Sequence, residues 1–151
     1  MSALLHYLLI AHVRFGLVGI IALYAVWMIL LKRNVPIRAL KIAAVTGFVS
    51  IVLSWFTGGY YYVAYYGTSV KPIILKGVYP WAHTVFIEAK EHVFLFLPFL
   101  AIVLALAAFL PAEGFAANPR LKKSLSALAG VSTVLGIIIT LSGVIISGAV
   151  R

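Results

Sequence analysis

The chain has 151 residues, of which 64% are hydrophobic and 10% are charged, and it contains no cysteine. A soluble domain carries about 25% charged residues, so this composition predicts a protein built for lipid, and the absence of cysteine excludes disulfides, thiolate-bound metals and cysteine-attached haem. The net charge of +9 comes from short basic runs between apolar segments. That pattern is typical of membrane topology signals and argues against nucleic acid as a partner.

Four apolar segments are each long enough to cross a hydrocarbon core of roughly 30 Å, which needs about 20 helical residues. We predict helices over residues 3–31, 40–66, 80–110 and 121–150, arranged as an up-and-down four-helix bundle. The chain is therefore expected to be an all-α, polytopic membrane protein with a single domain over residues 1–151. The first segment carries His6, His12 and Arg14 and lacks a basic leader, so we expect a retained helix and not a signal peptide.

Basic residues are distributed unequally between the connections. The loops at residues 31–41 and 111–123 hold seven Lys and Arg residues, whereas the opposite side holds three, Lys71, Lys76 and Arg151. The positive-inside rule then places a multi-pass protein in the cell membrane with both termini and the 67–80 loop outside the cytoplasm.

Five tyrosines gather at the end of the second segment, directly after Gly58-Gly59. They are Tyr60, Tyr61, Tyr62, Tyr65 and Tyr66. Tyrosine favours the headgroup level of a membrane, so one interpretation is an interfacial belt. The other is a tyrosine-lined pocket, since the glycine pair lets a second helix or a flat ligand approach the backbone closely.

The start of the third segment, residues 83–92, holds two of the three acidic residues and two of the four histidines. An ionisable residue at the centre of a membrane helix costs roughly 2.5–3.5 kcal/mol on insertion scales, so such residues usually serve a function. Helical spacing puts Glu88, Glu91 and His92 on one face, while His83 points elsewhere.

The fourth segment carries a stripe of small residues at three- and four-residue spacing: Gly136, Thr140, Gly143 and Ser147. Small residues allow tight helix packing in membranes. The stripe could face the other three helices or a second copy of the chain, which would make a homo-oligomer.

Two histidines are predicted to share one depth. His12 lies 19 residues before Leu31 and His92 lies 18 before Leu110, so both sit about 27–28 Å from the inner ends of their helices. We expect these two helices, the first and the third, to be parallel and to lie side by side. Gly16 and Gly19 follow His12 on its own helical face, and we expect them to leave a slot for a planar ring.

Two imidazoles at one depth could be the axial ligands of a haem b. In this hypothesis His12 and His92 bind iron, Gly16 and Gly19 make room for the ring, and Tyr62 helps to shape the outer pocket. The architecture and the placement of these two histidines resemble the small bis-histidine four-helix membrane cytochromes b. That resemblance implies one-electron transfer near the outer leaflet, with a quinol or a redox protein as partner.

Two alternatives stay open. A divalent transition metal could bind Glu88, Glu91 and His92 with help from His12, His6 or His83, since carboxylates and imidazoles at helical spacing suit such ions. The same charged residues could instead only hold helices together, as in an accessory subunit of a membrane complex. The chain has no Asp and no phosphate-binding loop, so an electron carrier or binding protein is favoured over a hydrolase or transferase.

Overall fold

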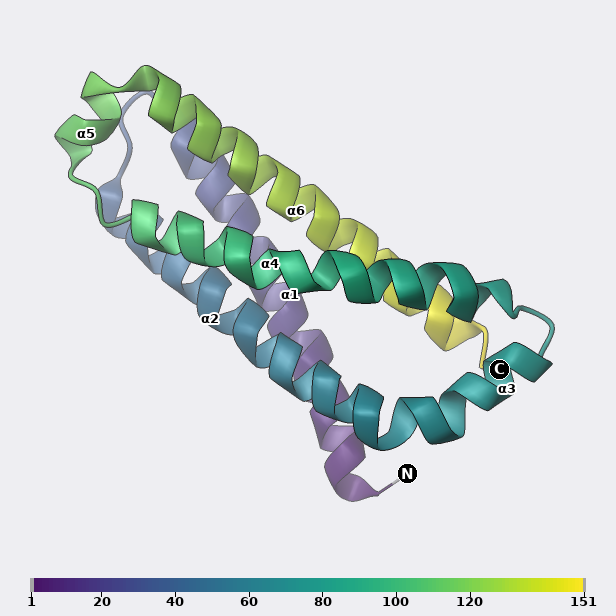
Figure 1. Ribbon diagram of the computed structural model, residues 1–151. Coiled ribbons are helices and arrows are strands. Elements are labelled where there is room, and N and C mark those ends of the chain that lie inside the picture. Colours follow the sequence, from purple (N-terminus) through teal and green to yellow (C-terminus); the bar gives the residue numbers. More distant parts are fainter. Residues whose placement is uncertain (1, 151) are drawn as a thin grey trace.

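The computed structural model describes residues 2–150, which form helices and connections and no strand (Figure 1). Four helical segments are long and apolar enough to cross a membrane: Ala3–Leu31, Ile37–Lys76, Ala82–Ala107 and Pro119–Gly148. The prediction of an all-α chain with four long apolar helices is confirmed.

The elements follow in chain order, and two of them, η1 and η2, are π-helices. They are α1 (Ala3–Leu31), α2 (Ile37–Tyr61), η1 (Tyr62–Val70), α3 (Lys71–Lys76), η2 (Ala82–Ile87), α4 (Glu88–Ala107), α5 (Ala112–Ala117) and α6 (Pro119–Gly148).

The second segment stays helical well beyond the predicted end at residue 66. It continues through η1 and α3 to Lys76, so the 67–80 loop shrinks to the short connection before η2. Tertiary packing explains the difference, because Tyr66 and Ile74 are buried in a cluster with Ile87 and Ile146. Pro72 lies at the junction of η1 and α3, where it has no N–H to donate to the preceding π-helical turn, and the chain stays helical on both sides of it.

The four long helices form a square in which α1 and α4 lie on a diagonal. Helix α1 packs against α2 and α6, and α4 packs against the same two helices (Figure 1). The sequence predicted that the first and third spans would be neighbours. The structure instead joins α1 and α4 mainly through side chains that meet inside the bundle.

Small residues bring α1 and α2 close together. A Cβ added to Gly19 would lie 2.8 Å from Ile51 Cδ1, and one added to Gly16 would lie 3.3 Å from Ser54 Oγ. Gly19 therefore packs against α2, whereas Gly16 lies near Ser54 of α2 and also lines the cavity described below.

Helices α1 and α6 are close in one half and separate in the other. A Cβ on Gly130 would lie 3.0 Å from Trp27 Cε2, and one on Gly136 would lie 2.7 Å from Ile20 Cγ1. Further along, the two helices diverge toward the separate ends marked N and C in Figure 1. The small-residue stripe of α6 thus faces into the bundle, with Gly136 against α1.

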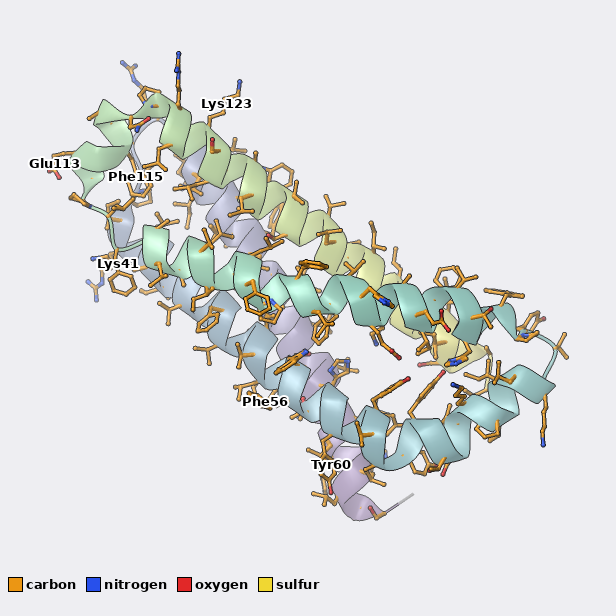
Figure 2. All side chains as sticks on the ribbon, in the orientation of Figure 1. Lys41, Phe56, Tyr60, Glu113, Phe115 and Lys123 are labelled. Carbon is orange, nitrogen blue, oxygen red and sulfur yellow. The ribbon has the colours of Figure 1, made fainter. Side chains whose placement is uncertain are left out.

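The connections rich in Lys and Arg lie together at one end, which we call the basic end. Figure 2 shows Lys41, Glu113 and Lys123 there, beside α5. Lys122 Nζ donates hydrogen bonds to the carbonyl oxygens of Lys32 and Arg33, which ties the start of α6 to the end of α1.

Candidate functional site

A cavity of about 420 Å³ lies between α1, α2, α4 and α6, in the half of the bundle away from the basic end. Its volume falls within the range of about 300–1,000 Å³ that is usual for ligand sites. Most of its lining is apolar or small. The polar and aromatic residues that line it are His12, Ser54, Lys90, Phe94, Thr140 and Ser147.

His12 is held in one orientation by Ser54 of α2. Its Nδ1 lies 2.9 Å from the backbone oxygen of Ser54, and the Ser54 hydroxyl donates to the backbone oxygen of His12 at 3.0 Å. The Ser54 hydroxyl oxygen also lies 3.0 Å from Nδ1. A carbonyl oxygen can only accept, so the contact with the Ser54 backbone oxygen favours the tautomer with the proton on Nδ1. In the neutral form of that tautomer, Nε2 has a free lone pair. This is the arrangement that orients a metal-binding histidine in many proteins.

Gly58 supplies the surface on which the imidazole rests. A Cβ added there would lie 2.6 Å from Cε1 and 3.0 Å from Cγ of His12, and also against Nδ1. A Cβ on the neighbouring Gly59 would meet nothing within 4 Å. Of the two possibilities raised by the sequence, a second helix or a flat ligand, the structure shows the first at Gly58, where a side chain of α1 rests on the backbone.

Helix α4 faces His12 with Phe94 and Lys90. The rings of His12 and Phe94 meet edge to face, with centroids 6.1 Å apart. The Lys90 ammonium reaches toward α6, where a Cβ on Gly143 would lie 3.6 Å from Nζ. His12 and residues 90–94 of α4 therefore meet across the bundle, at the depth that counting residues along the two helices suggested for the His12 and His92 pair.

His92 lies elsewhere on α4. Its side chain is exposed, it does not line the cavity, and its Nδ1 is 2.6 Å from the Glu88 carbonyl oxygen of the same helix. Two residues along a helix correspond to about 200° of rotation, so His92 points away from the face that carries Lys90 and Phe94. The structure thus brings His12 to the cavity and leaves His92 on another side of α4.

A second histidine is buried near η1. His83 and Tyr66 are each 4% exposed, and the Tyr66 hydroxyl lies 3.0 Å from Nδ1 of His83. Tyr62 stacks on Tyr66 with ring centroids 5.1 Å apart. This pair joins the two π-helices, so the tyrosine run supplies internal packing as well as exposed rings such as Tyr60.

The remaining predicted ligands do not converge. Glu88, Glu91 and His6 are exposed, and the ring of His6 packs only against Tyr7 among aromatic groups. Within residues 2–150, no group of three or more His, Asp and Glu residues is close enough to hold a metal ion.

Three features of the site escaped the sequence analysis: the hydrogen bonds of Ser54, the inward position of Lys90, and the two π-helices. Lys90 could have been found from its spacing, since Lys90, Phe94 and Leu97 recur at helical intervals and all line the cavity. A serine inside an apolar span gives no comparable signal.

Comparison with known proteins found no matching family model, no matching curated protein and no matching solved structure.

Proposed function

We propose that this chain is an integral membrane protein that binds a redox cofactor, haem b, through His12. The observation that carries the proposal is the orientation of His12. Its Nδ1 lies 2.9 Å from the Ser54 carbonyl oxygen, which can accept a hydrogen bond from Nδ1–H and so leaves Nε2 for a ligand. The ring lines a largely apolar cavity. Haem iron takes a neutral imidazole nitrogen as axial ligand, and the apolar lining suits the porphyrin.

The four apolar segments support insertion in the cell membrane, since each is long enough to span it. The basic end gathers the loops richest in Lys and Arg, so we propose that it faces the cytoplasm and that both termini lie on the other side. The cavity then opens near the outer leaflet, where a quinol or a redox protein could exchange electrons with the cofactor.

His12 alone is the ligand that the geometry supports best. His92 also has its Nδ1 at a backbone carbonyl, which leaves its Nε2 free in the same way. It lies on another side of α4, so a bis-histidine site would require α4 to turn about its axis. When bound, haem would supply one-electron chemistry, while His12 and Ser54 would anchor and orient it.

The test is a visible spectrum of the protein purified in detergent, with and without dithionite. We expect a Soret band with α and β bands that sharpen on reduction, and we expect His12→Ala to abolish it. His6→Ala is the matched control, because His6 lies on the same helix, is exposed and does not line the cavity.

The variants separate the competing hypotheses. Retention of haem in His92→Ala supports ligation by His12 without His92, whereas loss in both variants supports the bis-histidine site. A colourless protein with stoichiometric transition metal supports the Glu88, Glu91 and His92 site. A protein that takes up neither haem nor metal supports the accessory role, and full haem content in His12→Ala refutes our assignment.

A further inference from the structure

The cavity has an opening on the side of the bundle, between α1 and α6. Its rim includes Val13, which is 51% exposed, and Val144, which is 66% exposed. The two helices pack tightly at Gly136 and Ile20 and then diverge, so the rim is formed where they separate. In a membrane this opening would face the acyl chains, and a ligand would enter sideways from the bilayer.

Among residues 2–150, Lys90 is the one Lys or Arg residue that lines the cavity. The chain has three acidic residues in all, and the lining of the cavity, as far as residues 2–150 describe it, includes none of them. Glu91 is adjacent to Lys90 in sequence, but it is exposed and outside the lining. The ammonium therefore faces the cavity without an opposite charge from its walls.

The three hydroxyl groups of the lining already donate to backbone carbonyl oxygens. Thr140 Oγ1 donates to the Gly136 carbonyl at 3.0 Å, Ser147 Oγ donates to the Gly143 carbonyl at 2.8 Å, and the Ser54 hydroxyl donates to His12. Lys90 is thus the charged donor of the lining, and one ammonium matches one negative charge.

We propose that Lys90 binds the carboxylate of a lipophilic ligand that enters the cavity from the membrane between α1 and α6. A carboxylate fits because it carries a single charge and accepts charge-assisted hydrogen bonds, while the apolar lining covers a hydrophobic body. Two sources share this chemistry, a propionate of haem b and the head of a fatty acid. If the carboxylate is a haem propionate, the inference rests on the proposed function. If it is the head of a fatty acid, the inference is independent of haem binding.

The experiment compares the wild-type chain with Lys90→Gln in detergent. Hemin binding is followed by Soret absorbance and oleate binding by calorimetry. Haem dimethyl ester and oleyl alcohol serve as matched ligands that lack the carboxylate. Lys76→Gln is the matched control variant, since Lys76 is exposed and lies outside the lining.

We expect Lys90→Gln to weaken binding of the carboxylate ligand by about 10-fold or more, the loss expected for a hydrogen bond to a charged group. Lys90→Gln should leave the affinity for the neutral analogue unchanged. Lys76→Gln should bind the carboxylate ligand as tightly as wild type does, and Lys90→Arg should retain most of the affinity for it. Unchanged far-ultraviolet circular dichroism would show that the variant is folded.

The outcomes separate the two proposals. If wild type binds hemin and Lys90→Gln binds it equally well, the role of Lys90 is refuted while haem binding stands. If wild type binds no hemin but binds oleate through Lys90, the carboxylate site stands and the haem proposal fails. If the protein prefers neither acid over its neutral analogue, there is no carboxylate site.

Discussion

Replacing Gly58 with alanine should destabilise the protein through its contact with His12. The added Cβ would lie 2.6 Å from Cε1 of the imidazole, so the ring would have to move away from α2. The same movement would break the hydrogen bond from Nδ1 to the Ser54 carbonyl, which is 2.9 Å long.

The change in the free energy of unfolding combines one favourable term with two unfavourable ones. Alanine is favoured over glycine inside a helix by about 0.8–1.0 kcal/mol. Overpacking costs about 1–3 kcal/mol, and losing the hydrogen bond costs about 0.5–1.5 kcal/mol. We therefore expect Gly58→Ala to lower the free energy of unfolding by about 1–3 kcal/mol.

Gly59→Ala is the matched control, because a Cβ at that position meets nothing within 4 Å. It should keep the gain in helix propensity of up to about 1 kcal/mol. The assay is reversible unfolding in mixed detergent micelles, followed by circular dichroism, for wild type and both variants.

A double-mutant cycle with His12→Ala tests the cause. Without the imidazole, Gly58→Ala should become neutral or stabilising, which corresponds to a coupling of about 2 kcal/mol, within the range for residues in contact. Equal stabilities of the Gly58 and Gly59 variants, or an unchanged cost of Gly58→Ala in the His12→Ala background, would refute the packing of His12 on α2.

Three further predictions follow from other contacts. Tyr66→Phe removes the hydroxyl that is hydrogen-bonded to the buried Nδ1 of His83, and it should lower the free energy of unfolding by about 1–3 kcal/mol. The control Tyr60→Phe, at a residue 55% exposed, should change it by no more than about 0.5 kcal/mol. Equal effects of the two variants would contradict the hydrogen bond between Tyr66 and His83. Gly136→Ala puts a Cβ 2.7 Å from Ile20 Cγ1, whereas the Cβ of Gly143→Ala meets only Lys90 Nζ, at 3.6 Å. In thermal unfolding, Gly136→Ala should therefore be less stable than Gly143→Ala by about 2 kcal/mol. The reverse order would contradict the packing of α1 against α6. The chain has no cysteine, so single cysteines can report the topology. A membrane-impermeant thiol reagent added to intact spheroplasts should label Val78→Cys, at a residue 83% exposed, and should not label Glu113→Cys. Labelling of Glu113→Cys alone would show that the topology is the reverse of the proposed one.

Much of the architecture could be predicted from local sequence. Long apolar runs need only their length and composition to predict helices, and α1 begins and ends at the predicted residues 3 and 31. The depth of a residue in the bundle can also be predicted from local sequence, because it depends on the number of helical residues between that residue and the nearest loop. That is why the level of the site on α1 and α4 could be estimated by counting residues.

The continuation of α2 into η1 and α3 could not be predicted in this way. Gly67 and Pro72 suggest a loop, but Tyr66 and Ile74 are buried against η2 and α6. The stabilising partners are distant in sequence, so only the folded chain brings them together.

The amino-acid sequence alone determined that the chain forms four long apolar helices with a polar cluster near one end of the third. Only the tertiary structure decided which face of each helix points inward, placing Lys90 and Phe94 opposite His12, and His92 on another side of α4. In a soluble helix the apolar stripe marks the inner face. Here apolar side chains cover both the inner and the outer faces, so close contacts at small residues such as Gly19 and Gly58 set the rotation of each helix instead.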